Sequence, residues 1–345
     1  MIMATSTQQK QSPTPTEQML QMMSGLWVTR GIYVAAKLGI SDLLKDGPKT
    51  VQEIASATGT HTDSLYRILR MLAMIGIYGE SEGRTFSLTP LSETLVTDAT
   101  GSLRGAAIAE LGEVHYEAWG NIMHSVKTGE IAFDDHFGMD IWQYFETDPE
   151  KADNFNRYMA SSSEPLNEAI STTYDFSSVK KLVDVGGGLG GMISAILAKN
   201  PHLEGVIFDA PSVVARSKEF LSAKGLADRC ETIGGDFFES VPEGGDVYSM
   251  RWILHDWEDT KSLKILENIR KVLPADGKLL LAEAVVPGTN EPHFSKFFDL
   301  IMLTMTGGRE RTETEWRQLL GQAGFHIQRI IPTESFLSII EAVPA

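Results

Sequence analysis

The sequence predicts an α/β fold in which a mostly parallel sheet, covered by helices on both faces, follows a smaller helical region. From residue 180 onward, short β-rich runs alternate with helical runs, a pattern typical of parallel strands joined by crossover helices. Upstream of residue 110, apolar residues recur at helical spacing, as in residues 19–38 and 64–77. With 345 residues, the chain is long enough for two domains.

The helical region, residues 16–110, has a winged-helix-like pattern. Its surplus of apolar residues predicts a dimerisation surface, because a lone domain exposing them would aggregate. The expected elements are a helix at 51–59, a second helix at 61–75 with Thr62 or Asp63 as its N-cap, and a β-wing at 77–88.

Residues 111–175 are expected to form further helices that link the two domains and line a substrate pocket. Helices are expected at 115–129, 139–146 and 149–174. Aromatic residues and methionines are frequent there, and most of them are expected to pack in the core or the dimer interface. A few, with Phe155 and Met159 as candidates, would wall an apolar pocket.

The catalytic domain is predicted to span residues 176–345. Its expected strands are 181–185, 205–209, 231–234, 247–251, 278–283, 326–332 and 336–342, with helices at 192–200, 211–224, 259–273 and 314–323. The closing pair of strands must be antiparallel, because only a few residues separate them. Ligands of such sheets bind beyond the carboxyl ends of the strands, so the chemistry is expected there.

Composition excludes several classes of protein. The net charge of −16 disfavours nucleic acid as a partner, since phosphates repel an acidic surface. Cys230 is the only cysteine, so neither an intrachain disulfide nor a thiolate metal cluster can form; we expect no metal, and a reducing cytoplasm fits. No apolar run is long enough to span a membrane. Residues 1–15 are polar, without a signal-peptide core, and are expected to be a disordered tail.

A glycine-rich turn between a buried strand and a helix indicates a cofactor that contains adenosine. Gly186, Gly188 and Gly191 supply positions where the backbone can take positive φ or approach a ligand closely. Asp209 ends the next strand, 21 residues after Gly188, where a carboxylate can accept hydrogen bonds from ribose hydroxyls. The same glycines formally satisfy the dinucleotide fingerprint, so a nicotinamide-dependent oxidoreductase stays an alternative.

Two features favour S-adenosyl-L-methionine as the cofactor. The loops at the site are acidic, which suits a sulfonium cation better than a pyrophosphate. After the third strand, Asp236 offers a carboxylate for the adenine amine and Phe237 an aromatic face for its ring. The alternative role for Asp236 is that of a turn former or helix cap.

Five motifs then give the chain a family resemblance that covers nearly all of it after the tail. They are LVDVGGGLG, IFDAPSVV, GGDFFESVP, MRWILHDWED and MLTMTGGRERTETEWRQLLGQAGF. In content, order and spacing the chain resembles the dimeric small-molecule O-methyltransferases of plants and bacteria, which include caffeic acid, isoflavone, anthracycline and mitomycin methyltransferases. The resemblance implies a class I S-adenosylmethionine-dependent methyltransferase domain, Rossmann-like, with an N-terminal winged-helix-like dimerisation domain, and a homodimer.

The resemblance also implies roles for residues near the cofactor. Positions similar to the family's cofactor contacts are Gly186, Gly188, Asp209, Asp236, Phe237 and Arg251, with Ser163 from the preceding helical region and Trp257 beside the adenine.

His255 is the expected general base. A phenol has a pKa of about 10, so a group that titrates near pH 7 has to remove its proton, and His255 lies just past a strand that ends at the cofactor cleft. Glu283 is the first candidate to orient the imidazole, because it interrupts an apolar run at a strand end and a buried carboxylate needs a partner. Glu310 is the second; in the family the matching glutamates flank the histidine. Its alternative is a solvated loop charge paired with a neighbouring arginine.

The acceptor pocket is expected to be apolar and adaptable. Met305 stands where plant relatives have an asparagine that contacts substrate hydroxyls, so plant substrate preferences are not transferable. The candidate substrate contacts are Phe155, Met159, Met302, Met305 and Asp256.

The expected function is S-adenosylmethionine-dependent O-methylation of a hydroxyl, phenolic in kind, on a small aromatic natural product. A winged-helix transcription regulator is the other alternative. Against it, the helix at 61–75 offers only Arg67 and Arg70 as basic residues, and the chain is acidic.

Overall fold

The structure of this chain is a computed structural model that describes residues 13–99, 101–147, 159 and 163–345. Contacts divide the chain into two compact units, Met1–Gly112 and Glu113–Ala345. Phe155 lies outside the described residues, as do most of the expected tail and much of the helix expected at 149–174. Within the described part of the chain, no helix is both long enough and apolar enough to cross a bilayer.

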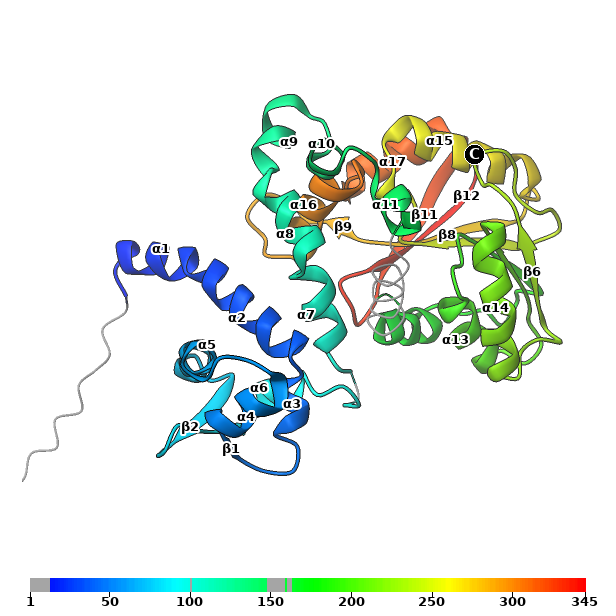
Figure 1. The fold of residues 1–345 in the computed structure, drawn as a ribbon. Helices are drawn as coiled ribbons and strands as arrows, with labels where there is room; N and C mark the ends of the chain where they lie inside the picture. The colour runs from blue at the N-terminus through cyan, green and yellow to red at the C-terminus, as the bar shows by residue number, and fades with distance from the viewer. Residues whose placement is uncertain (1–12, 100, 148–158, 160–162) are drawn as a thin grey trace, which may run out of the picture. The chain divides into compact units, whose positions relative to one another are not determined.

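The first unit is helical with a small antiparallel sheet in the order β1-β3-β2 (Figure 1). Its elements are α1 (Pro15–Met23), α2 (Gly25–Lys37), α3 (Ile40–Leu43), β1 (Lys49–Thr50), α4 (Val51–Thr58), α5 (Thr62–Met74), β2 (Tyr78–Ser81), β3 (Thr85–Leu88), α6 (Pro90–Glu93) and α7 (Arg104–Glu110). The winged-helix-like pattern is confirmed. The predicted N-cap of α5 was wrong, because the side chain of His61 accepts the backbone N–H of Ser64.

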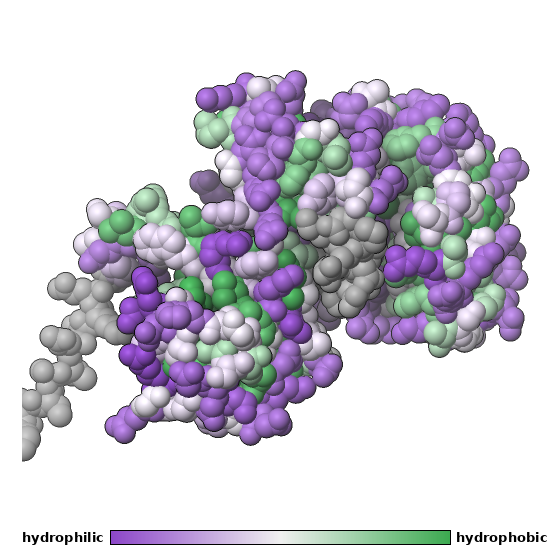
Figure 2. All heavy atoms as spheres, in the orientation of Figure 1, coloured by the Kyte–Doolittle hydropathy of each residue, from purple (hydrophilic) through white to green (hydrophobic). Residues whose placement is uncertain are grey.

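Apolar side chains of the first unit are both buried and exposed. One face of α5 packs Leu65, Leu69 and Leu72 into the core of the unit. In contrast, none of the residues of α1 is buried, and green atoms lie on its surface (Figure 2). The exposed large apolar side chains of α1 and the start of α2 are Met19, Leu20, Met22, Met23, Leu26 and Trp27. Such a cluster is larger than isolated surface residues would produce.

The second unit begins with short helices. These are α8 (Glu113–Gly120), α9 (Ile122–Thr128), α10 (Ala132–Phe137) and α11 (Ile141–Thr147), and residues 163–173 are also helical. The single helix expected at 115–129 is therefore broken at Asn121. Helix α16 (Ser295–Met305) was not among the expected elements.

A seven-stranded sheet forms the rest of the unit, in the order β11-β12-β8-β7-β4-β5-β6. Its strands are β4 (Lys181–Val185), β5 (Glu204–Asp209), β6 (Cys230–Gly234), β7 (Val247–Arg251), β8 (Lys278–Glu283), β11 (Phe325–Pro332) and β12 (Ser338–Pro344). Strands β4 to β8 pair in parallel, whereas β12 pairs antiparallel with both β8 and β11. The expected mostly parallel sheet with an antiparallel closing pair is confirmed.

Helices cover both faces of this sheet (Figure 1). On one face lie α15 (Asp259–Val272) and α17 (Glu313–Gln322), whose apolar residues join one core cluster. On the other lie α13 (Gly191–Lys199) and α14 (Pro211–Ala223), which contribute to a second cluster. Because β4 to β8 are parallel, the loops that follow them meet at one edge of the sheet.

Candidate active site

The glycine-rich loop after β4 is folded as a ligand cradle. Gly186 and Gly188 have φ of +72° and +57°, values that L side chains rarely adopt. A Cβ on Gly186 would lie 2.4 Å from the Cδ1 of Ile253, so a side chain at this position would displace that of Ile253. The backbone N–H of Gly188 donates to Asp209 Oδ2 at 2.8 Å, which joins the loop to the end of β5. Two predicted cofactor residues are thus in direct contact.

The predicted adenine-side residues also meet. The rings of Phe237 and Trp257 lie 6.3 Å apart between centroids, and the ring of Phe238, which the sequence analysis did not name, lies 4.9 Å from that of Trp257. Asp236 Oδ1 accepts the backbone N–H of Phe238 at 2.8 Å, the turn-forming contact that was considered as its alternative role. The Asp236 residue is exposed, so its second oxygen can still meet a ligand.

Several buried polar atoms of the second unit have no hydrogen-bond partner among the described residues. They include Ser163 Oγ, Asn167 Oδ1, Asp184 Oδ2, and Nε and Nη1 of Arg251. A Cβ on Gly191 would meet Asn167 Nδ2 at 2.8 Å, and one on Gly187 would meet Asp184 Oδ2 at 3.0 Å, so both side chains border the loop. Unpaired buried groups of both polarities cost free energy unless a ligand satisfies them. This set fits a zwitterionic amino acid attached to a ribose.

Asp184 was not predicted as a site residue. It is the one acidic residue in the apolar strand β4, and Ser249 Oγ donates to its Oδ1 at 2.8 Å. Burial raises the pKa of its carboxyl to about 7, against the opposing effects of Ser249 and the positive charge of Arg251. The signal that singled out Glu283, a carboxylate interrupting an apolar strand, was present here as well.

His255 lies in a short 3-10 turn, Leu254–Asp256, directly after β7. Its imidazole is buried, and Nδ1 lies 2.8 Å from Glu310 Oε1. Its Nε2 lies 3.7 Å from Asp256 Oδ1, beyond hydrogen-bond distance. Burial acts to lower the pKa of His255, but the charges of Asp256, Glu310 and Glu283 and the hydrogen bond to Glu310 outweigh it and raise the pKa to about 9. The imidazole therefore has one nitrogen held and the other available.

The order of the two glutamates differs from the prediction. Glu310 makes the hydrogen bond to His255, and it is a buried residue rather than a solvated loop charge. Glu283 Oε1 instead accepts the backbone N–H groups of Ile253 and Leu254 at 3.1 and 3.0 Å, so it holds the start of the histidine turn. Burial raises the pKa of Glu283 to about 7, although the charge of His255 opposes this. Both glutamates thus act on His255, by different routes.

Two aromatic rings lie beside the imidazole and nearly parallel to it. The rings of Trp252 and Phe298 lie 6.0 and 5.7 Å from that of His255, with interplanar angles of 10° and 22°. Trp252 has a φ of 55°, a left-handed conformation that is strained for a bulky residue and that clusters at functional sites. Neither ring was named by the sequence analysis, since the stack forms between β7 and the unexpected helix α16.

The candidate acceptor residues lie in different surroundings. Asp256 is half-buried beside His255, and Met302 and Met305 are buried on α16. Met305 packs in a cluster with Phe133 and Ile141, whereas Met159 is half-buried and helical. Their contact with an acceptor stays a prediction. No group of three or more residues suited to a metal ion occurs among the residues that the structure describes.

Family models match both parts of the chain. The model for an O-methyltransferase dimerisation domain matches residues 20–98, and that for an O-methyltransferase domain matches residues 119–326. The second match includes the glycine loop, the histidine turn and Glu310.

Similar proteins span almost the whole chain. A phenazine O-methyltransferase of Lysobacter antibioticus is 44% identical over 94% of this chain and 95% of its own length. The mitomycin biosynthesis 6-O-methyltransferase of Streptomyces lavendulae is 38% identical over 90% of this chain and 89% of its own length. A phenazine-1-carboxylate N-methyltransferase of Pseudomonas aeruginosa is 30% identical over 91% and 92% of the two chains.

One of the similar solved structures contains S-adenosylmethionine. An O-methyltransferase from neocarzinostatin biosynthesis, in complex with S-adenosylmethionine and 2-hydroxy-5-methyl naphthoic acid, has a TM-score of 0.84 and 30% identity, covering 94% of this chain and 98% of its own. Family membership favours S-adenosylmethionine over a nicotinamide cofactor and an enzyme over a transcription regulator. The chain belongs to the O-methyltransferase family that carries an N-terminal dimerisation domain, and it is an S-adenosylmethionine-dependent methyltransferase.

Proposed function

We propose that this enzyme methylates a phenolic hydroxyl of a small, planar aromatic natural product and that His255 is the general base. The observation that carries the proposal is the environment of the imidazole: it is buried, Nδ1 is bonded to Glu310, and Nε2 lies beyond hydrogen-bond distance of Asp256. A base in that state can accept a proton from an acceptor placed beside Nε2.

The balance of the reaction defines what the residues have to do. Bound S-adenosylmethionine supplies an electrophilic methyl group. The acceptor oxygen forms a bond to the methyl carbon while the carbon–sulfur bond breaks, its electron pair stays on sulfur, and the hydroxyl proton moves to His255 Nε2. Glu310 then stabilises the imidazolium, and Glu283 holds the backbone of the turn that carries it. The remaining contribution of the chain is to align the two reactants and exclude water.

The cofactor side of the proposal rests on the loop residues. Asp209 is already hydrogen-bonded to the loop, and it is proposed to accept hydrogen bonds from the ribose hydroxyls. Phe237 and Trp257 are proposed to flank the adenine, with Asp236 near its amine. The unpaired atoms of Ser163, Asp184 and Arg251 are proposed to face the methionine portion.

Aromatic surroundings support the acceptor class. Trp252 and Phe298 lie parallel to the imidazole, so a flat ring that enters beside His255 would meet aromatic faces. The relatives named above act on phenazine, mitomycin and naphthoate skeletons, all of which are fused-ring compounds. An aromatic nitrogen acceptor is the second candidate, favoured by the N-methyltransferase relative.

The decisive experiment compares His255→Ala with the wild type on acceptors of graded acidity. On an ordinary phenol, kcat should fall by roughly 10²–10⁴-fold, the usual contribution of acid–base catalysis. An electron-poor phenol is already ionised at pH 7, so the variant should recover much of its rate on that substrate. His326→Ala, at an exposed histidine of β11, is the control and should stay within about twofold of the wild type.

Two outcomes would contradict the oxygen proposal. Near-wild-type turnover of an ordinary phenol by His255→Ala would exclude the base. Transfer of labelled methyl only to aza-heterocycles, at a rate that His255→Ala leaves unchanged, would favour the nitrogen acceptor, whose lone pair needs no deprotonation.

The exposed apolar surface of α1 and the match to a dimerisation domain support a homodimer. Sedimentation velocity at micromolar concentration measures the state directly, and a monodisperse monomer would contradict it.

A further inference from the structure

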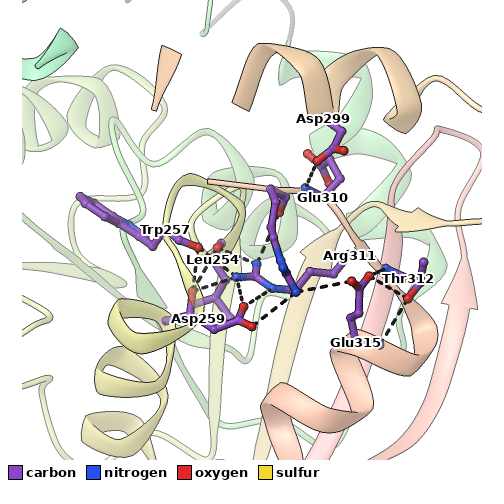
Figure 3. Close-up of polar contacts among 10 residues, drawn as sticks. Leu254, Trp257, Asp259, Asp299, Glu310, Arg311, Thr312 and Glu315 are labelled. Atoms are coloured by element: carbon purple, nitrogen blue, oxygen red, sulfur yellow. Dashed lines mark hydrogen bonds and ion pairs between the residues drawn. The ribbon is translucent and has the colours of Figure 1, made fainter. Parts of the chain in front are cut away.

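The guanidinium of Arg311 lies beside the histidine turn and is completely buried (Figure 3). Arg311 belongs to the short strand β10 (Arg311–Thr312), which pairs in parallel with β9 (Val285–Val286) just beyond Glu283. Buried arginines are rare unless several partners satisfy them, so its contacts indicate what it holds.

Two of those contacts are backbone carbonyls on either side of His255. Nη1 donates to the carbonyl oxygen of Leu254 at 2.9 Å, and Nη2 donates to that of Trp257, also at 2.9 Å. The planar guanidinium presents its N–H groups in a fixed geometry, so it sets the separation of the two carbonyls it bridges. One side chain therefore holds the residue before the base and the residue proposed to flank the adenine.

The charge of Arg311 is balanced from the helix that follows the turn. Asp259 Oδ1 accepts Nη2 at 2.8 Å and Nε at 3.1 Å, and Asp259 is the first residue of α15 (Figure 3). The Oγ of Ser262 lies within 3.2 Å of both carbonyls that Arg311 bridges. The ring of Trp316 packs 5.2 Å from the guanidinium carbon.

Glu283 and Arg311 hold opposite groups of the same turn. Glu283 binds the backbone N–H groups of Ile253 and Leu254, whereas Arg311 binds the carbonyls of Leu254 and Trp257. The carbonyl of His255 itself accepts the backbone N–H of Arg309 at 2.8 Å. The side chain that these bonds position is the imidazole, whose Nδ1 must stay within reach of Glu310.

We propose that Arg311 is a positioning residue for methyl transfer, which fixes His255 against Glu310 and couples that geometry to the cofactor side through Trp257. The inference rests on the proposed function, because it assigns Arg311 to the same base. Arg311 itself acts only through the backbone of the turn.

Arg311→Lys is the main test, because it keeps the positive charge but replaces the fixed planar fork of the guanidinium with rotatable donors on one nitrogen. We expect kcat to fall about ten- to hundredfold and KM for S-adenosylmethionine to rise severalfold, since the turn reaches both sides of the site. The pKa of His255, followed by NMR in the ligand-free enzyme, should also fall. The imidazole would lose part of its contact with Glu310, while burial and the charges of Asp256 and Glu283 would remain.

Controls separate positioning from general destabilisation. Arg317→Met removes an exposed arginine of α17 that pairs with Glu313, and it should leave the pKa of His255 and both kinetic constants unchanged. Asp259→Asn, at a half-exposed site, should shift the same three quantities in the same direction but less than Arg311→Lys. If Arg311→Lys fails to fold by circular dichroism, Asp259→Asn carries the test.

Failure of this inference and failure of the proposed function are distinguishable. A folded Arg311→Lys with wild-type kcat and an unshifted His255 pKa would overturn the role of Arg311, whatever His255→Ala shows. A shifted pKa in Arg311→Lys together with a fully active His255→Ala would keep the positioning role but remove the base.

Discussion

Two buried glutamates on neighbouring strands of the sheet have opposite electrostatic environments. Glu341 in β12 lies opposite Leu280 of β8, and Glu283 ends β8 itself. Glu341 accepts hydrogen bonds from Arg329 and Tyr174 and lies 3.4 Å from the ammonium of Lys278. Burial acts to raise its pKa, but those partners outweigh burial and the pKa is lowered.

Around Glu283 the balance is reversed. One oxygen accepts two backbone N–H groups, and Oε2 has no partner among the described residues. Burial dominates, and the pKa rises to about 7. Breaking the contacts of a fully paired buried carboxylate destabilises the fold, whereas a carboxylate left under-satisfied beside a histidine is available for chemistry. The contrast separates structural from functional charge within one sheet.

Among the tests of this contrast, the largest effect is expected on the pH dependence of the reaction. Catalysis needs neutral His255, and its pKa of about 9 means that the protonated form prevails in the free enzyme at pH 7. For a phenol that stays un-ionised, kcat/KM should rise up to about fiftyfold between pH 7 and pH 9, as the neutral fraction grows. Glu310→Gln should move this rise to lower pH. A flat profile would mean that the carboxylates around His255 do not hold its proton.

A smaller effect is expected when each glutamate is neutralised. Glu283→Gln should lower kcat by about ten- to thirtyfold, since it keeps the shape but removes a charge that stabilises the imidazolium. Glu341→Gln should leave kcat within about twofold and lower the free energy of unfolding by about 1–3 kcal/mol, because its cationic partners are partly exposed. Steady-state kinetics measures kcat for the two variants, and denaturant unfolding measures their free energies of unfolding. Equal kinetic losses would abolish the distinction between the two carboxylates.

The smallest effect concerns the midpoint of thermal unfolding. A carboxyl whose pKa is raised on folding binds a proton more tightly in the native state, so stability falls as pH rises from its unfolded pKa of about 4.3 toward 7. The melting temperature of Glu283→Gln, relative to that of the wild type, should therefore rise by a few degrees as the pH increases from 5 to 8. The pKa of Glu341 is lowered, so Glu341→Gln should unfold at a lower temperature than the wild type throughout that pH interval. This difference in melting temperature should shrink below pH 4. If the melting temperatures of the two variants changed with pH in the same way, the opposite pKa directions of Glu283 and Glu341 would be contradicted.

Much of the fold could be predicted because its signals are local. Short β-rich runs that alternate with helical runs located β4 to β8. Asp209 at the end of one strand and His255 just past another were thereby placed at one edge of the sheet. The helix α16 was missed, because a short apolar run is compatible with either a strand or a buried helix.

The details of the site depend on contacts between distant segments. Which of the two glutamates reaches the imidazole depends on how the loop at 307–311 meets the histidine turn, and 55 residues separate His255 from Glu310. From the sequence alone Arg311 is expected to be a solvated loop cation, because the carbonyls that it binds belong to residues more than fifty positions earlier in the chain. Asp184 has the same sequence signal as Glu283, because its carboxylate also interrupts an apolar strand.

The backbone bond between Arg309 and His255 also bears on the order in which the molecule assembles. A Cβ on Gly308 would lie 1.8 Å from the carbonyl oxygen of His255, so the two loops close on each other without space for a side chain. Bringing together two segments that are more than fifty residues apart in the sequence has an entropic cost, which has to be met before their contacts contribute. On the ribosome, the histidine turn is synthesised well before the segment that completes it. A nascent chain that ends before residue 307 contains the base but neither Glu310 nor Arg311, so activity reports completion of the C-terminal part of the fold.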